Sequence, residues 1–509
     1  MAASVDRLRI AVVGSGAAAA GVLLAIARRF PHSYVVLVER QREAIRLDKP
    51  PADHRPDPAF WQHFYVSLRS QNGLTFPPPK THFGVSCPRL PVENRGFVWE
   101  SRERGGLTNY WGGMAAVFTD RDFRRWPFGV TELVPFYRMA AKDIGIAGQT
   151  DVLTSLFKHE IINRPPVRPT ETTRRLIDAV NTSGPQQGFE IKAGTARLAV
   201  ETRASHPRAC TYTGDCMIGC SREAIYCATG TVETFIRSGS RVVGAKVLAF
   251  DAASLGLMIE DEQSGRHEHI GPFDFIFLAA GCIGTAEIVL RSNSNLSAIR
   301  FRDNPVASFP ILYSGGLDDR SVESYFALTN GIVVGMPADV AEPAFSVQVY
   351  PAMDHLWRYF TPVSLWKLMQ PFGRMLRRRL LIGRLYLHSE YGPAFSLSLS
   401  RGSKPEIRLE KARIDQPGAW TAVRAALNRE GFHVPNLRPV RHFTSSHYSA
   451  SLPYGTAGLS PTGEISPRIF ACDSSVFPNA PASPPTLTII ANAMRTVYAA
   501  ADRYESAKA

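Results

Sequence analysis

The chain opens with a short apolar run that is followed at once by glycines. The sequence RIAVV at 9–13 predicts a buried strand, GSG follows as a turn, and the apolar spacing of 17–30 predicts a helix. A second apolar run, YVVLVE at 34–39, predicts another strand. Strand, glycine turn, helix and strand in this order are typical of a βαβ unit that binds a dinucleotide.

Small residues stand at the positions where such a unit needs them. Gly14 allows the tight turn, Gly16 lets a pyrophosphate approach the backbone, and Ala19 permits close packing of the helix on the strand. Glu39 ends the second strand, where a carboxylate accepts hydrogen bonds from a ribose hydroxyl. We therefore expect these four residues to bind a dinucleotide cofactor.

Two later segments repeat the pattern of a buried strand that leads into a helix. FDFIFLA at 273–279 predicts a strand, and Gly281 and Gly284 predict a turn before the next helix. Near the end of the sequence, IFACDSSVFP precedes a helix predicted over 486–502. We expect both segments to belong to the same α/β domain as the first unit.

The pattern changes to short alternating runs in the middle of the chain. AFSLSLS at 394–400 and EIRLE flank the turn sequence RGSKP, which predicts an antiparallel hairpin. The fold class expected is therefore α/β, with an inserted, sheet-rich domain. We place the boundaries at 1–305 with 433–509 for the first domain and at 306–432 for the second, to which parts of 60–200 contribute.

Length and composition are those of a folded protein with more than one domain. The chain has 509 residues, of which 45% are hydrophobic and 20% charged. We expect it to be cytoplasmic, because no secretory signal opens the sequence and no run of about 20 apolar residues could span a bilayer.

The net charge of +13 is unevenly distributed. The segment 356–387 mixes Trp357, Trp366 and Phe372 with leucines and with arginines that include Arg374, Arg377, Arg378, Arg379 and Arg384. This composition suits a helix that lies on an anionic membrane surface. A helix packed on the core, with its arginines extended into water, is the alternative. No nucleic-acid-binding motif accompanies the charge, so we expect no nucleic-acid partner.

Four of the seven cysteines fall within CTYTGDCMIGCSREAIYC at 210–227. The close CxxC pairs of most zinc sites are absent, which disfavours zinc. Thiolates also hold iron–sulfur clusters, so Cys210, Cys216 and Cys220 are candidate cluster ligands, and a structural loop is the alternative. The remaining cysteines are interpreted as structural or packing residues: Cys227, Cys87, Cys282 and Cys472.

Four segments, taken in order, resemble the glucose–methanol–choline (GMC) oxidoreductases: GSGAAAAG, GGLTNYWGG, LAAGCIGTAEIVLRS and CDSSVFPNAPASPPTLTIIANAMR. The resemblance covers both ends of the chain and is weak across 300–430. It implies an FAD-binding Rossmann-like domain with an inserted α+β substrate domain built on an antiparallel sheet. It also implies oxidation of an alcohol or sugar hydroxyl by hydride transfer to flavin N5.

The resemblance assigns cofactor contacts residue by residue. Gly14, Gly16 and Ala19 would receive the FAD pyrophosphate, and Glu39 the adenosine ribose. The other implied contacts are Gly105, Gly106 and Asn109 along the flavin, Val247 at the adenine, Gly281 at the FAD crevice, Asp473 near the ribityl–pyrophosphate region, and Thr486 beside the isoalloxazine.

The segment HYSASLPYG carries the candidate catalytic base. His447 and Gly455 keep the frame of the family motif, although Ala450 and Ser451 replace its usual Gly-Thr pair. A neutral imidazole is suited to removing the hydroxyl proton near pH 7. We therefore expect His447 to be the general base, with His442 as the alternative.

Pro484 departs from the family pattern, which has a second His or Asn at this position to hold the substrate hydroxyl. Ser446, Ser483 or Asn479 could replace that partner. The other hypotheses are a flavin-containing isomerase, lyase or cyclase with altered chemistry, and a non-catalytic flavoprotein that docks on membranes.

The cysteine-rich stretch resembles a loop in bacterial FAD-dependent glucose and glucoside-3-dehydrogenases of this family. The resemblance implies a 3Fe-4S cluster on Cys210, Cys216 and Cys220 that passes electrons from FAD to an electron-acceptor protein or a quinone. Without a cluster, oxygen or another acceptor would take the electrons.

Overall fold

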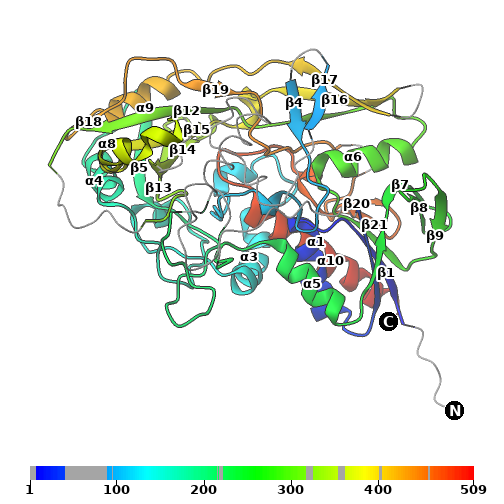
Figure 1. Cartoon of the computed structure of the whole chain (residues 1–509). Coiled ribbons are helices and arrows are strands. Elements are labelled where there is room, and N and C mark those ends of the chain that lie inside the picture. Colours follow the sequence, from blue (N-terminus) through cyan, green and yellow to red (C-terminus); the bar gives the residue numbers. More distant parts are fainter. Residues whose placement is uncertain are drawn as a thin grey trace.

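The computed structural model describes residues 7–40, 89–93, 96–214, 216, 220, 222–316, 325–352, 361–400, 404–456 and 459–508. Cys87 and Trp357 lie outside the described residues. Figure 1 shows two bodies of secondary structure side by side, one around β1 and α1 and the other around β12 to β15.

The first body is built on a six-stranded sheet in the order β20-β21-β10-β1-β2-β6. All neighbouring strands run parallel except β20, which pairs antiparallel with β21 at the edge. The strands are β1 (Arg9–Val13), β2 (Tyr34–Glu39), β6 (Arg241–Gly244), β10 (Phe275–Leu278), β20 (Glu464–Ser466) and β21 (Ile469–Ala471). The strands predicted at 9–13 and 34–39 are confirmed, and the one predicted at 273–279 is confirmed in a shorter form.

Helices cover one face of this sheet and a second layer of strands covers the other. Figure 1 shows α1, α5 and α10 lying together beside the sheet, and Ile10 and Val12 pack into their core. Ala11 and Val13 point to the opposite face, toward α6 and the three-stranded sheet β7-β8-β9. These elements are α1 (Ala17–Arg29), α3 (Val130–Ile144), α5 (Ala228–Arg237), α6 (Gly281–Ser292), α10 (Thr486–Ser506), β7 (Lys246–Asp251), β8 (Gly256–Glu260) and β9 (His267–Ile270).

The second body is a seven-stranded antiparallel sheet in the order β18-β12-β15-β14-β13-β5, with β19 also paired to β12. Helices α4 (Glu171–Asn181) and α9 (Ala419–Leu427) pack on the apolar face of its strands. The strands are β5 (Phe189–Thr195), β12 (Val306–Tyr313), β13 (Gly331–Pro337), β14 (Phe345–Pro351), β15 (Leu380–Tyr386), β18 (Phe432–His433) and β19 (Val440–His442). Two of them, β5 and β19, come from outside the predicted 306–432 segment, and the domain boundaries stay a prediction.

The predicted hairpin after residue 394 is confirmed, because β16 (Ala394–Leu399) pairs antiparallel with β17 (Pro405–Lys411). It belongs to a separate five-stranded sheet with β11 (Ala298–Arg302), β3 (Arg89–Val92) and β4 (Gly96–Trp99). This sheet packs on the first body, where Phe301, Phe395 and Leu397 join the core beside α6.

The prediction of one helix over 356–387 is wrong from residue 380 onward. Helix α8 (Trp366–Arg379) ends at Arg379, and the chain continues directly as strand β15. The reason is that LLIGRLY at 380–386 pairs on both sides, with β12 and β14, and hydrogen bonds to two neighbours outweigh a local helical preference. Across the described ranges, no helix is long and apolar enough to cross a membrane.

Candidate active site

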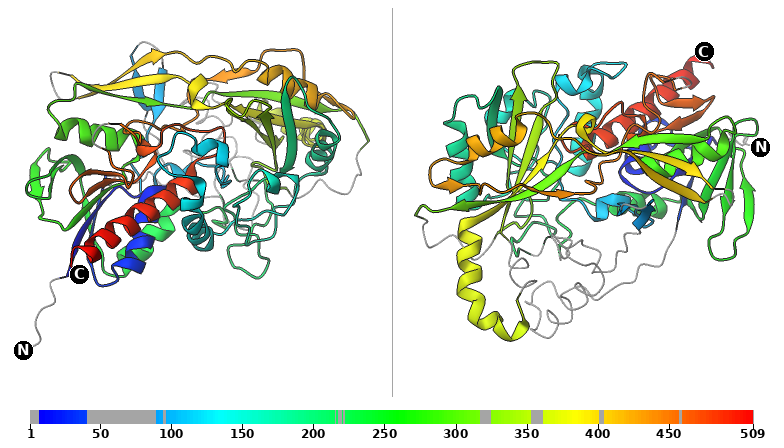
Figure 2. Two further views of the ribbon diagram at one scale, coloured as in Figure 1. Left: turned by 180° about the vertical axis from the view of Figure 1, so that it is seen from behind. Right: turned by 90° about the horizontal axis from the view of Figure 1, so that it is seen from above.

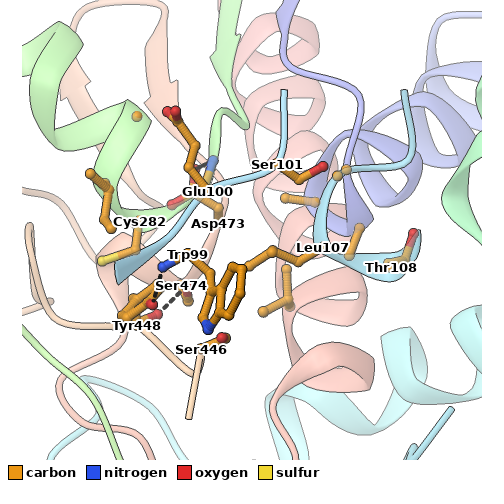
Figure 3. Close-up of a pocket in the computed structure, with 18 of the residues that line it drawn as sticks. Trp99, Glu100, Ser101, Leu107, Thr108, Cys282, Ser446, Tyr448, Asp473 and Ser474 are labelled. Atoms are coloured by element: carbon orange, nitrogen blue, oxygen red, sulfur yellow. Dashed lines mark hydrogen bonds between the residues drawn. The ribbon is translucent and has the colours of Figure 1, made fainter. Parts of the chain in front are cut away.

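A cavity of about 490 Å³ runs from the glycine turn after β1 to the inner face of the seven-stranded sheet. At one end it is lined by Gly14, Gly16 and Glu39, and at the other by His442 and His447. Figure 3 shows part of its wall, where the backbone N–H of Trp99 donates a hydrogen bond to the Tyr448 hydroxyl. Residues from the two bodies and from the connecting segments therefore enclose one space.

The two predicted glycine segments meet at the first end of the cavity. Gly14 has a φ of +99°, and a Cβ atom there would lie 2.5 Å from the carbonyl oxygen of Ala279. The N–H of Gly105 donates to the Ser15 carbonyl at 3.0 Å, and a Cβ on Gly106 would lie 3.0 Å from the Cα of Gly16. Side chains are therefore excluded here, which leaves backbone N–H groups at the start of α1 open to an anionic ligand.

Ala19 and Asn109 do not line the cavity. Ala19 is a fully buried residue of α1, where a small side chain allows helix and sheet to pack closely. The Asn109 amide donates to the Arg104 carbonyl at 2.9 Å and accepts from the Cys227 thiol at 2.9 Å. Asn109 and Cys227 thus stabilise the glycine loop without lining the cavity. Leu107 and Thr108 line the cavity instead.

Glu39 has one satisfied and one unsatisfied carboxylate oxygen. Its Oε1 accepts from the Arg104 guanidinium, at 3.0 Å from Nε. Its Oε2 is buried and has no hydrogen-bond partner among the described residues. Leaving a buried carboxylate oxygen unpaired costs free energy, so this oxygen is available to accept a hydrogen bond from a ligand hydroxyl. Val247 lines the same end of the cavity.

Asp473 connects the start of α6 to the segment before α10. Its Oδ2 accepts from the N–H of Gly281 at 2.9 Å and from the Thr285 hydroxyl, and its Oδ1 accepts from the N–H of Ser475 at 2.9 Å. Burial raises the pKa of this carboxyl above its ordinary value, although these hydrogen bonds act in the opposite direction. Asp473, Gly281 and Thr486 all line the cavity, and Thr486 begins α10, whose N-terminal dipole favours negative charge at that point.

These features fit FAD. A glycine turn at the N-terminus of α1 suits the pyrophosphate, the unsatisfied Glu39 oxygen suits a ribose hydroxyl, and the start of α10 suits the electron-rich end of a flavin.

His447 lies at the far end of the cavity, half-buried, with its ring stacked on Tyr386. The ring centroids are 5.3 Å apart and the planes differ by 20°. The Nδ1 atom is buried without a hydrogen-bond partner in the part of the chain that the structure describes. Burial, with a smaller contribution from the positive charge of Arg384, lowers the pKa of His447 to about 4. The imidazole is therefore neutral at pH 7 and able to accept a proton.

A buried aspartate that the sequence analysis missed positions this histidine. Asp303 accepts from the N–H of His447 at 2.9 Å and from the N–H of Ser445 at 2.7 Å. It also accepts from the Thr444 hydroxyl at 2.6 Å. Ser446, between them, has a φ of +67°, which a non-glycine residue adopts only when its surroundings hold it there. Asp303 is remote in sequence and carries no motif, so the sequence offered no signal for this role.

His442 and Pro484 line the cavity with His447. His442 Nε2 shares a hydrogen bond of 2.8 Å with the Ser308 hydroxyl, and burial, followed by the charge of Arg384, lowers the pKa of His442 to about 4. Of the three alternatives considered from the sequence, Ser446 lines the cavity, whereas Ser483 and Asn479 do not. The structure therefore brings a second neutral imidazole into the chamber where Pro484 offers no polar side chain.

The cysteine loop lies apart from this cavity. Cys216 is buried in the main core, and Cys210 and Cys220 are half-buried against it. Burial raises the pKa of the Cys210 thiol to about 11, and the N–H of Ala224 donates to Cys220 Sγ at 3.3 Å. Within the described residues, no group of three or more His, Cys, Asp or Glu side chains could hold a metal ion. Residues 215, 217–219 and 221 of this loop lie outside the described ranges.

No known family model matches the chain, and no curated protein sequence matches it significantly. Solved structures do match. Pyridoxine 4-oxidase from Mesorbium loti is 14% identical with a TM-score of 0.61, and the match covers 97% of this chain and 99% of that one. A fungal aryl-alcohol oxidase is 9% identical with a TM-score of 0.60, over 98% of this chain and all of the other.

A third match is an FAD-dependent oxidoreductase from Chaetomium thermophilum, 12% identical with a TM-score of 0.58 over 98% of this chain. At these identities the likeness establishes the fold. The predicted fold class is confirmed: a Rossmann-like α/β domain joined to an antiparallel sheet.

Proposed function

We propose that this chain is an FAD-dependent oxidoreductase that oxidises an alcohol or sugar hydroxyl group, with His447 as the general base. One observation carries the proposal: a single cavity joins a dinucleotide-type glycine turn and Glu39 to a neutral His447, whose buried Nδ1 has no partner among the described residues. FAD, when bound, supplies the two-electron acceptor for the alcohol carbon. Two of the matched structures are an aryl-alcohol oxidase and a pyridoxine 4-oxidase, and these enzyme names support the same kind of reaction.

The described side chains can handle the proton of such a reaction. His447 takes the hydroxyl proton. Its ring is oriented by stacking on Tyr386 and by the hydrogen bond that its backbone N–H donates to Asp303. We infer that His442 supplies the second polar contact to the hydroxyl, because it lies in the same chamber as Pro484 and is held by Ser308. The flavin-containing isomerase, lyase or cyclase stays the alternative, since Pro484 removes the usual second residue.

The test is to purify the protein, identify the released cofactor, and add alcohols under anaerobic conditions. The proposal predicts bound FAD whose visible absorbance is bleached by at least one member of a panel of sugars, polyols, aromatic alcohols and hydroxy acids. Bound FAD that turns a substrate over without net reduction would favour the isomerase or lyase alternative.

The route of the electrons after FAD is a separate proposal. A 3Fe-4S cluster on Cys210, Cys216 and Cys220, serving an electron-acceptor protein, rests on the resemblance of that loop. Iron and sulfide analysis of anaerobically purified protein tests it, with an EPR spectrum of the oxidised sample. Iron near zero at full FAD occupancy would reject the cluster and leave oxygen or a diffusible acceptor.

We also propose that α8 contacts an anionic membrane surface. Figure 2 shows α8 extending from the body of the second sheet. Leu368 is 74% exposed, Phe372 42% and Met375 46%, and the same helix carries the exposed Arg374. Apolar side chains beside arginines favour anionic lipid. Flotation with phosphatidylserine vesicles should be lost in the Leu368→Glu variant, and equal flotation of both proteins would reject the contact.

A further inference from the structure

Arg384 extends from β15 into the catalytic end of the cavity. Its cross-strand neighbours are Ser308 on β12 and Gln348 on β14, so the three residues share the sheet face that is turned away from α4 and α9. Gln348 and Arg384 line the cavity together with Tyr350. This face of the sheet is therefore polar where it forms the wall of the cavity.

The guanidinium of Arg384 has only neutral neighbours among the described residues. No carboxylate that the structure describes forms an ion pair with it, and its Nε is buried without a hydrogen-bond partner. Its contacts are with the Tyr350 hydroxyl and with the ring of Tyr386, whose centroid lies 5.6 Å from Cζ. The Tyr350 hydroxyl itself donates to Gln348 at 2.6 Å. Among the described residues, no negative charge therefore compensates the positive charge of Arg384.

Five acidic side chains line the cavity, and four of them have identified partners; the fifth, Glu103, lies in the loop before Gly105. Glu39 is paired with Arg104, Glu100 with Arg102, and Glu287 with Lys246. Asp473 accepts hydrogen bonds from the start of α6. These groups come from the nucleotide-binding body, so the catalytic chamber holds a half-buried cation, Arg384, together with two neutral imidazoles, His442 and His447.

We propose that the substrate carries a carboxylate in addition to the hydroxyl group that is oxidised, and that Arg384 binds this carboxylate. The inference rests on the proposed function and adds the substrate class to it. A planar guanidinium matches a carboxylate by two parallel hydrogen bonds, and a charge buried without a partner is costly until the partner arrives. One guanidinium compensates one negative charge, so a carboxylate fits the chamber better than a phosphate dianion.

Carboxylate binding also affects the base. Arg384 contributes to the low pKa of His447, and a bound anion cancels part of that positive potential. A carboxylate substrate therefore makes the imidazole more basic as it binds. The carboxylate takes no part in the redox step: the hydroxyl proton goes to His447, the hydrogen on the alcohol carbon leaves with its electron pair as a hydride equivalent for which FAD would be the acceptor, and the product is an oxo acid.

The first experiment measures binding in the FAD-loaded enzyme without turnover. Benzoate, acetate and hexanoate are titrated while the visible flavin spectrum is recorded, with benzamide as the neutral control. We expect a saturable spectral change with at least one carboxylate and none with benzamide. In Arg384→Gln the affinity should fall roughly 30-fold or more, with Arg384→Lys intermediate. Equal responses in wild type and Arg384→Gln, or no saturable response to any carboxylate, would overturn the proposal.

The second experiment compares hydroxy acids, such as para-(hydroxymethyl)benzoate and glycerate, with their methyl esters in anaerobic flavin reduction. We expect each acid to be preferred over its ester, and the preference to vanish in Arg384→Gln. Arg174→Gln, which removes a side chain that is 60% exposed on α4, is the matched control and should change nothing. Faster reduction by the esters would overturn the inference while leaving the proposed function intact, whereas failure of every alcohol would count against the proposed function.

Discussion

Replacing His447 by Asn removes the proposed base and keeps a polar side chain in its place. A positioned general base contributes about 10²- to 10⁴-fold to a rate, or about 2.7–5.5 kcal/mol of barrier. We expect the upper half of this range, because the ring has a buried Nδ1 atom, stacks on Tyr386 and is held by a turn that Asp303 anchors.

The pH dependence has a definite sign. Since burial lowers the pKa of His447 to about 4, the imidazole is already deprotonated above about pH 5, and the rate of flavin reduction in wild type should be flat from there to pH 8. Below pH 4 the rate should fall about tenfold per pH unit, because only the neutral ring accepts a proton. The Asn variant should lack this acidic limb.

Stability depends on the same shift. Between pH 6.5 and about 4 the unfolded chain protonates His447 but the folded one does not, so wild type loses stability as the pH falls through this window. The shift corresponds to about 3 kcal/mol at most. His447→Asn should show a shallower loss in urea unfolding over the same pH range.

Stopped-flow measurement of anaerobic flavin reduction tests the rate. His433→Asn, the same change at an exposed histidine on β18, is the matched control and should reduce its flavin as wild type does. Equal FAD content in all three proteins must accompany the comparison. A His447→Asn rate within about threefold of wild type would refute the assignment of the base.

Four further outcomes are expected. Gly14→Ala should lose FAD on gel filtration, because the new Cβ would meet the Ala279 carbonyl at 2.5 Å in a left-handed backbone; a full FAD complement would contradict this. Glu39→Gln should bind FAD about tenfold more weakly by fluorescence titration, and unchanged affinity would reject its contact to the ribose. Asp303→Asn should lower the melting temperature and slow flavin reduction together, whereas normal kinetics at a lower melting temperature would limit Asp303 to a structural role. Arg197→Ala should cost about 3–5 kcal/mol of unfolding free energy in urea, because it leaves the carboxylates of Asp151 and Glu160, whose side chains are 14% and 8% exposed, without their buried cation; a loss below about 1 kcal/mol would contradict that.

The elements that follow from local pattern could be predicted from the sequence. In the segment 9–39 the spacing of apolar residues changes from that of a strand to that of a helix at the glycine turn, and the structure shows β1, α1 and β2 there. The hairpin after residue 394 is equally local, since alternation and a Gly-Ser-Lys-Pro turn specify it. Which sheet that hairpin joins depends on pairing with β11, and alternation carries no information on a distant partner.

The site residues divide in the same way. Gly14 and Glu39 have fixed spacings within one βαβ unit, so the sequence could predict that they lie close together, and both line the cavity. Asn109 was expected along the flavin, but its amide is turned to Cys227 and the glycine loop, a direction that no spacing encodes. Arg384 was interpreted as one of a run of surface arginines, because Leu380–Tyr386 continues the basic helix without a break in composition. Only the pairing of β15 between two strands brings this arginine into the cavity.

The central claim is that this chain oxidises an alcohol with bound FAD, and a single-turnover titration tests it most directly. The FAD-loaded protein is mixed anaerobically with one alcohol of the reactive panel, and the reduced flavin and the carbonyl product are both quantified. The account predicts one carbonyl per flavin reduced in wild type, and formation slowed by at least about 10²-fold in His447→Asn. A protein that binds no FAD, or bound FAD that stays oxidised with every alcohol tested, would contradict it.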